Sequence, residues 1–599
     1  MLNQQIEAIT DRIVSRSEST RELYMEQMSA QFNQEITRVH LNCGNLAHAA
    51  AGASANEKAA LEKNFVPNLA IITAYNDMLS AHKTYEHYPE MIRQLAIKYN
   101  AVAQVAGGVP AMCDGVTQGQ AGMELSLFSR DVISLSTAIG LSHNLFDGIL
   151  CLGICDKIVP GLLIGALKFG HLPFAFVPGG PMPSGISNEE KSKIRQDFAE
   201  GKIDRAALLK GEFDSYHSPG TCTFYGTANS NQMLMEIMGL QLPSSSFVNP
   251  NTKLRDVLNE KIVQILAQTA TKKSIYGSLC NIVDEKSIVN AIVGLLATGG
   301  STNHTIHLIA IAKAAGIIIN WQDFSDLSDI VPLITRVYPN GAADVNHFHA
   351  AGGMGFVIHT LLSNGLLHND VNTILGFGLD KYTKEAKIIE NELVWVEGEK
   401  KSGNDSILRE VANPFQEKSG IRMMEGNIGR AVMKTSAVPS DQLIIEAPAI
   451  VFDEQEDLIK AFKNNELNKD FIAVLPFQGP KQNGMPELHQ LTPTLTILQK
   501  RGFKVGLVTD GRMSGASGKV AAAIHVVPEA KDGGLISKIR SGDLISMNAI
   551  TGELVCIDPQ VEKRPARIKD NSAVSGLGRE LFANMRTLVT SSEEGASFL

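Results

Sequence analysis

From Asn68 onward the chain alternates short apolar segments with longer stretches of helical period. The first apolar segments all have the length of a β-strand, and they are Leu69–Ala74, Ala101–Ala106, Gly148–Ile154 and Pro173–Val177. Turn residues and stretches of helical spacing, such as 123–141 and 160–169, lie between them. This alternation is typical of a largely parallel sheet covered by helices, with reactive side chains at the carboxyl ends of the strands. The sequence therefore predicts an α/β fold for this part of the chain.

The N-terminal region and a charged stretch bound this α/β part. Residues 1–65 are polar, with Ile6, Ile9 and Ile13 at helical spacing, and indicate a helical arm for docking or oligomerisation. Residues 390–413 are charged and poor in strands, so we place the domain boundary among them. The predicted large domain therefore covers 66–405.

The remainder of the chain, 406–599, predicts a smaller domain rich in β-structure. Its short β-like segments are Leu443–Phe452, Phe471–Leu475, Val505–Thr509 and a hairpin formed by Asp543–Met547 and Glu553–Ile557. We expect a β-barrel-like domain with C-terminal helices.

Charge and hydropathy exclude several classes of partner. The chain has 54 Lys and Arg against 63 Asp and Glu, a net charge of −9, and no basic run, which argues against nucleic acid. Apolar runs such as 148–155 are shorter than the roughly 18 residues that span a bilayer. The first 32 residues lack the apolar core of a signal peptide. We expect a soluble, cytoplasmic protein that binds neither membranes nor nucleic acid.

The seven cysteines are too few and too scattered for a disulfide framework. Cys113, Cys155 and Cys222 each lie in a loop beside a predicted strand or helix end. Three thiolates from separate loops suit an iron–sulfur cluster that keeps one iron position open for substrate. The alternative is that each is an ordinary small buried residue, because free cysteine is often buried.

The remaining cysteines test whether this selection is meaningful. Cys151 lies four residues before Cys155 on what reads as one strand, so their Cα atoms would be about 13 Å apart and both could hardly bind one cluster. We therefore predict that Cys151 belongs to the core, as do Cys280 and Cys556. Cys43 lacks the acidic neighbour that follows Cys113 and Cys155.

Acidic residues accompany two of the loop cysteines. Asp114 and Asp156 follow Cys113 and Cys155 directly, and Glu487 lies in the Gly- and Pro-rich loop 479–487. Carboxylate oxygens suit Mg²⁺, although each acid could instead cap a helix or a turn.

Two other polar segments could carry chemistry. His347 and His349 could bind a metal or could simply be polar residues on one face. Ser514 lies among glycines after an apolar strand, where backbone N–H groups could bind an anion beside its hydroxyl. The segment is not a Gly-x-Ser-x-Gly nucleophile elbow.

A set of motifs spans the chain from the N-terminal arm almost to the C-terminus. They are Cys43–His48, Ala74–His82, Gly108–Gly119, Cys155–Gly161, Gly220–Asn229, Ala297–Asn303, Asn483–Leu488 and Thr509–Lys519. Through them the chain resembles the dihydroxy-acid and sugar-acid dehydratase family, and most closely its branch that acts on 6-phosphogluconate in the Entner-Doudoroff pathway. The resemblance implies an N-terminal α/β domain, a C-terminal β-barrel domain, a homodimer, an iron–sulfur cluster and Mg²⁺.

The family's cofactor ligands can be carried over position by position. Cys155 and Cys222 match two cluster ligands. The three residues Asp114, Asp156 and Glu487 match the magnesium carboxylates.

The resemblance also assigns two reactive side chains. Lys157 matches a lysine that is carbamylated in relatives, which would make it an oxygen ligand of the metal within the catalytic site. Ser514 matches the base that takes the C2 proton while the cluster assists departure of the C3 hydroxyl. The substrate would then be a phosphorylated sugar acid, with a branched dihydroxy acid or an unphosphorylated sugar acid as the alternative.

The chain departs from the family at one cluster ligand. Relatives that act on branched-chain acids have a Pro-Cys-Asn motif where this chain reads Ser80-Ala81-His82. We predict that Cys113 supplies the third thiolate from another loop, which favours a 4Fe-4S over a 2Fe-2S cluster. The departure also argues against a branched-chain substrate.

An alternative is a non-catalytic iron–sulfur redox sensor, which would need a cluster but no acids for Mg²⁺ beside it. A structural zinc protein would lack visible absorbance when purified without oxygen. For the substrate phosphate we predict Lys481 and Lys519, which lie in the two loops that carry Glu487 and Ser514. The alternative is that both are solvated surface lysines.

Overall fold

The N-terminal domain is built on a four-stranded sheet in the order β2-β1-β3-β4. The computed structural model describes residues 1–515, 517–570 and 575–599. The strands are β1 (Asn68–Thr73), β2 (Val102–Gly108), β3 (Gly148–Leu152) and β4 (Phe174–Phe176). Every neighbouring pair is parallel, which confirms the predicted α/β fold. The central strands β1 and β3 are buried along almost their whole length because helices cover both faces of the sheet.

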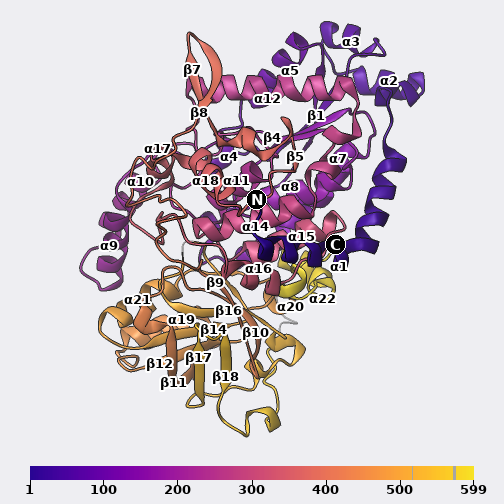
Figure 1. The fold of residues 1–599 in the computed structure, drawn as a ribbon. Helices are drawn as coiled ribbons and strands as arrows, with labels where there is room; N and C mark the ends of the chain where they lie inside the picture. Colours follow the sequence, from indigo (N-terminus) through magenta and orange to yellow (C-terminus); the bar gives the residue numbers. More distant parts are fainter. Residues whose placement is uncertain (516, 571–574) are drawn as a thin grey trace.

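Alternate strand residues point to opposite faces, and each face has its own helices. Ile72 and Cys151 pack in one core with the helices α7 (Phe128–Leu141) and α8 (Ile158–Leu167). Leu69 and Leu150 pack in another with α5 (Tyr88–Lys98) and α12 (Lys253–Lys272). The sheet therefore lies in the middle of a three-layer arrangement, with α12 along its outer side (Figure 1).

The N-terminal arm is helical, as predicted, and α1 (Gln4–Gln31) docks on its own chain. Ile6, Ile9 and Ile13 are buried in the large core of the domain. Arg16 Nη2 lies 2.6 Å from Asp323 Oδ2 in α16 (Trp321–Ser328). The helical spacing of the isoleucines thus marks the docked face of α1. Among the described helices, none combines the length and apolar character needed to cross a membrane.

The C-terminal region forms a closed barrel in the order β10-β16-β14-β12-β11-β17-β18-β9. In chain order its strands are β9 (Ile421–Gly426), β10 (Gly429–Lys434), β11 (Ile444–Val451), β12 (Phe471–Leu475), β14 (Val505–Thr509), β16 (Ala521–Val527), β17 (Leu544–Asn548) and β18 (Glu553–Cys556). The predicted hairpin is confirmed as the antiparallel pair β17–β18. The barrel lies beneath the N-terminal domain in Figure 1.

Two details differ from the sequence analysis. Residues 390–413 are not free of strands, because β8 (Glu392–Glu397) pairs with β7 (Lys384–Ile389) in a hairpin. The last residues leave the barrel and pack on α7, where Arg130 Nη1 donates to the Gly595 carbonyl at 2.9 Å. A tail contact of this kind depends on the packing of the two domains and has no local sequence signature.

Two short barrel-domain strands reach toward the N-terminal domain. β13 (Glu487–Leu488) and β15 (Arg512–Met513) form a separate parallel pair in which Glu487 is opposite Arg512. They follow β12 and β14, so the carboxyl ends of these barrel strands supply residues to the domain junction. The carboxyl ends of β2 and β3 supply the other side.

Candidate active site

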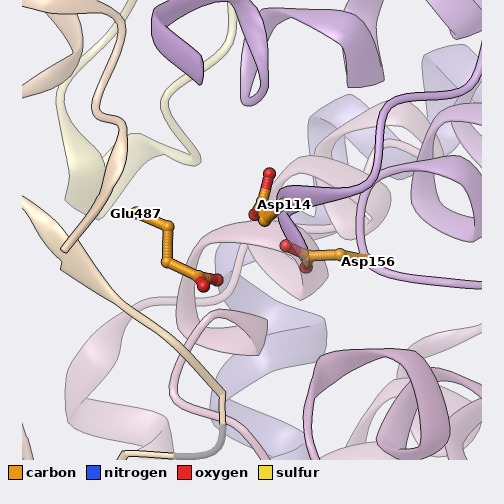
Figure 2. Close-up of side chains that lie close together, drawn as sticks. All are labelled: Asp114, Asp156 and Glu487. Atoms are coloured by element: carbon orange, nitrogen blue, oxygen red, sulfur yellow. The ribbon is translucent and has the colours of Figure 1, made fainter. Parts of the chain in front are cut away.

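Three buried carboxylates meet between the two domains. Asp114 begins the short helix α6 (Asp114–Thr117), Asp156 lies in the turn between β3 and α8, and Glu487 lies on β13. One ligand oxygen from each lies within 4.8 Å of the others. Figure 2 shows Glu487 directed from the barrel side toward the two aspartates. The triad is a set of hard oxygen donors that could hold a metal ion.

Two buried cations compensate the charge of these acids. Lys157 Nζ lies 2.6 Å from Asp114 Oδ1 and 3.1 Å from Asp156 Oδ2. Arg512 approaches all three acids, at 2.9 Å from Asp114 Oδ2, 3.3 Å from Asp156 Oδ2 and 3.5 Å from Glu487 Oε2. The site therefore brings three carboxyl groups against two cations.

The acids respond differently to this environment. Burial raises the pKa of Asp156, but Lys157 and a hydrogen bond from His307 outweigh burial and hold it well below its usual range. Burial and the charge of Asp114 raise the pKa of Glu487 to about 8 despite Arg512. Glu487 is thus the acid that carries a proton near neutral pH, and a cation bound here would displace that proton.

Several residues that hold the acids in place were missed by the sequence analysis. His307, on α15 (His304–Ala314), has its Nε2 3.2 Å from Asp156 Oδ1. Asn231 Nδ2 donates to the carbonyls of Cys155 at 3.0 Å and Asp156 at 2.9 Å. Arg512 lies inside the motif 509–519 and could have been suspected there, whereas His307 has no local signal.

The structure brings Cys113, Cys155 and Cys222 into mutual interaction. A hydrogen bond with the Cys155 side chain lowers the pKa of Cys113 to about 7 and raises that of Cys155 well above its usual value. Burial, followed by the charge of Cys113, raises the pKa of Cys222 to about 12. The thiols come from three loops, after β2, after β3 and in the turn 220–226.

The other cysteines lie elsewhere, as predicted. Cys151 is fully buried in the sheet core, Cys280 and Cys556 are also buried, and Cys43 is exposed. The reason given for Cys151 needs correction, because β3 ends at Leu152 and Cys155 is not on the same strand. Cys155 instead has a left-handed backbone, with φ 86°, in the turn that follows.

The cysteine-free segment Ser80–Lys83, helix α4, connects two of the cysteine loops. His82 Nε2 donates to the Ile154 carbonyl at 2.8 Å, next to Cys155. The Ser80 carbonyl accepts from the Gly220 N–H at 2.9 Å, close to Cys222. This segment therefore supports both loops although it contributes no thiol.

The buried His82 side chain makes the free energy of unfolding of the protein depend on pH. Burial lowers its pKa to about 4, whereas an unfolded histidine titrates near 6.5. Between these values only the unfolded chain binds the proton, so stability is lost as the pH falls from about 6.5 toward 4, by on the order of 2 kcal/mol at pH 5.

We expect the melting temperature of His82→Gln, followed by circular dichroism, to fall less between pH 7 and pH 5 than that of the unmodified protein. The glutamine amide keeps a donor for Ile154 and does not titrate. His87→Gln is the matched control, because the His87 side chain is 89% exposed. If the melting temperature of His82→Gln fell with pH as much as that of the unmodified protein, His82 would not be the source of this pH dependence.

The loop that carries Ser514 packs between two segments of the N-terminal domain. Gly515 lies so close that a Cβ atom there would be 2.6 Å from Thr227 N and 2.9 Å from Ser301 Oγ. Thr227 is the first residue of α11 (Thr227–Ile237), and Ser301 belongs to the Gly-rich loop 299–303 that follows α14 (Glu285–Thr298). Glycine at 515 thus allows the half-buried Ser514 to sit near the Cys222 turn.

The other candidate residues fall outside the acid triad. Lys481 Nζ lies 2.6 Å from Asp532 Oδ2. Lys519 is exposed, with its Nζ 5.2 Å from the centroid of the Tyr338 ring. His347 and His349 lie on the helix α17 (Val345–Ala350), where Nδ1 of His347 is 2.6 Å from Asp344 Oδ1 at the helix start.

The arrangement combines two ligand sets on shared loops. Cys113 precedes Asp114 and Cys155 precedes Asp156, so soft thiol donors and hard carboxylate donors lie side by side. The thiols and the carboxylates could each hold a different metal centre, and one substrate could bind between the two centres. Ser514 lies on a neighbouring loop.

Known proteins are similar to this chain in sequence along its whole length. Models described as dihydroxy-acid/6-phosphogluconate dehydratase N-terminal and C-terminal match residues 66–382 and 406–596. The chain is 55% identical over 599 residues to a phosphogluconate dehydratase of Escherichia coli (strain K12), covering 100% of this chain and 99% of that protein. It is 57% identical over 599 residues to the protein of the same name from Rhizobium meliloti (strain 1021), covering 99% of each. A dihydroxy-acid dehydratase of Caldanaerobacter subterraneus subsp. tengcongensis is 32% identical over 554 residues, covering 89% of this chain and 94% of that protein.

Proposed function

This chain belongs to the dihydroxy-acid/6-phosphogluconate dehydratase family and is a hydro-lyase, and from this premise we propose that it dehydrates 6-phospho-D-gluconate. The product is 2-dehydro-3-deoxy-6-phospho-D-gluconate, an intermediate of the Entner-Doudoroff pathway. The observation that carries the proposal is the identity of 55–57% to phosphogluconate dehydratases over the full length, against 32% to a dihydroxy-acid dehydratase. The family resemblance also leads us to propose a homodimer in the cytoplasm.

We propose that Cys113, Cys155 and Cys222 hold an iron–sulfur cluster, with 4Fe-4S favoured over 2Fe-2S. The interaction of their thiols and the low pKa of Cys113 support this, because the thiolate is the form that binds metal. Three protein thiolates would leave one iron position free for substrate.

We propose that the acid triad Asp114, Asp156 and Glu487 holds Mg²⁺. Lys157 becomes a further oxygen ligand when carbamylated. Carbamylation replaces a positive by a negative charge, so it would turn a nearly neutral cluster into one that attracts a divalent cation. When bound, the two cofactors would supply Lewis acidity for the leaving C3 hydroxyl and for the C1 carboxylate and C2 hydroxyl.

Residues of the chain itself then transfer the C2 proton. Ser514, as its alkoxide, accepts the proton from C2, the C2–H and C3–O bonds break, and the C3 hydroxyl takes that proton from Ser514 and leaves as water. The enol that remains tautomerises to the 2-keto acid. A serine is ordinarily too weak a base, so Ser514 needs a nearby cation that favours its alkoxide.

The test is an assay of protein purified without oxygen, read as 2-keto acid formed from 6-phosphogluconate. Gluconate and a branched 2,3-dihydroxy acid serve as the alternative substrates. We expect the highest kcat/KM on 6-phosphogluconate. A higher kcat/KM on either alternative would contradict the proposed substrate.

Removal of Mg²⁺ gives a separate prediction. We expect brief treatment with EDTA to abolish turnover and added Mg²⁺ to restore it, because the triad is a set of oxygen donors. The visible absorbance should persist, because thiolates and not the acids hold the cluster. Full turnover after chelation, with the metal shown to be gone by elemental analysis, would rule out this role of the triad.

A further inference from the structure

Basic side chains from both domains gather beside the Cys222 turn, in a protein of net charge −9. Lys191 and Arg195 come from α9 (Asn188–Ala199), and Lys500 and Lys519 come from the C-terminal domain. The domains touch here, since Lys500 Nζ donates to Gln196 Oε1 at 3.1 Å. Figure 1 shows α9 extending from the N-terminal domain toward the barrel-domain helix α21 (Leu491–Lys500).

Two of these cations already have partners. Arg195 makes a two-pronged contact with Glu212, with distances of 2.6 Å from Nε and 2.8 Å from Nη2. Lys500 is held by Gln196. In contrast, no carboxylate of the described residues forms an ion pair with Lys191 or Lys519.

Lys191 is held by an aromatic ring and not by an acid. Its Nζ lies 3.6 Å from the centroid of the Tyr216 ring. Burial, and then Arg195, lower its pKa to about 8, and Cys222 is among the groups that act on it in the opposite direction. An ammonium over a ring face keeps N–H groups free for an anion on its other side.

Lys519 approaches the same turn from the C-terminal domain. Its Nζ lies over the ring of Tyr338, and the Tyr338 carbonyl accepts from the Tyr225 N–H at 2.8 Å. Tyr225 belongs to the turn 220–226 that carries Cys222. Lys519 also closes the loop of Ser514, so it is connected to both the base and the turn.

We propose that Lys191 and Lys519 together bind the terminal phosphate of the substrate, one from each domain. The inference rests on the proposed function, and it names the residues that distinguish a phosphorylated from an unphosphorylated sugar acid. A phosphomonoester carries about −1.5 to −2 charges at neutral pH, which would match two cations that form no close ion pair with a described carboxylate, although Glu212 and Glu189 act on them from a greater distance. The phosphate must also lie away from Asp114, Asp156 and Glu487, because like charges repel.

This pairing differs from the pair drawn from the sequence. Lys519 was expected to act with Lys481, whose ammonium is engaged with Asp532 at 2.6 Å. Lys191 carries no such ion pair among the described residues, and it lies on the opposite domain.

The test compares Lys191→Met and Lys519→Met on 6-phosphogluconate and gluconate, with iron content and visible absorbance measured on each variant. We expect KM for 6-phosphogluconate to rise about 10- to 100-fold, as for loss of a charge-assisted hydrogen bond. KM for gluconate should change far less. Lys191→Arg should retain most of the affinity, and Lys193→Met, an exposed lysine on the same helix, is the matched control.

Inorganic phosphate gives a second readout. As a competitive inhibitor it should lose affinity in Lys191→Met and Lys519→Met by a factor similar to the rise in KM, and not in Lys193→Met. Equal changes on both substrates, or an unchanged inhibition constant, would overturn the inference while the proposed function stands. A wild-type protein that forms no 2-keto acid from 6-phosphogluconate would overturn both.

Discussion

We expect Cys113→Ser to lose the proposed iron–sulfur cluster and, with it, the turnover of 6-phosphogluconate. Cys113 has a lowered pKa because its thiolate accepts a hydrogen bond from Cys155, so it is the thiol of the three most readily deprotonated. A serine hydroxyl at this position deprotonates far less readily and is a hard ligand that suits iron–sulfur chemistry poorly. Iron and sulfide per chain, visible absorbance and turnover should all fall to background.

Two variants serve as controls for this loss. Cys43→Ser changes an exposed cysteine, and Cys151→Ala changes a core cysteine on β3. Both should keep their iron and absorbance, although Cys151→Ala should melt at a lower temperature because it leaves a small cavity. Full cluster content in Cys113→Ser would show that the third ligand lies elsewhere.

We expect Ser514→Ala to lower kcat by at least about 100-fold, the low end for removal of a positioned acid–base group. In the proposed mechanism the C2 proton then has no acceptor, while the loop keeps its position because Gly515 still packs against Thr227 and Ser301. Cluster absorbance and magnesium content should be unchanged. Anaerobic steady-state kinetics with metal analysis measures both effects.

Ser517→Ala is the matched control, because it makes the same change three residues further along the loop. Ser517 Oγ lies 3.0 Å from Thr492 Oγ1, and we assign it no role in the reaction. Its turnover should remain within about twofold of the unmodified protein, as for substitutions remote from the chemistry. Near-normal turnover in Ser514→Ala would mean that another group takes the proton.

The strands of the α/β domain and the barrel hairpin were predictable because their signals are local. Apolar runs of strand length mark β1 to β4, and the pair β17–β18 is separated by a short turn. β8 was missed because it lies in a stretch rich in charge, and its apolar residues Leu393 and Trp395 are only partly buried against the core.

For the candidate site, the sequence by itself determined the pairs Cys113-Asp114 and Cys155-Asp156, because covalent neighbours share a loop whatever the fold. It also marked the loops of Glu487 and Ser514 through their glycines. Only the tertiary structure decided which groups compensate these charges. Arg512 reaches Asp114 across 398 positions of the chain, and Lys191 and Lys519 approach one turn from different domains. Periodicity and turn chemistry act over a few residues, whereas the distance between charges is set by sheet order and domain packing, which no local pattern encodes.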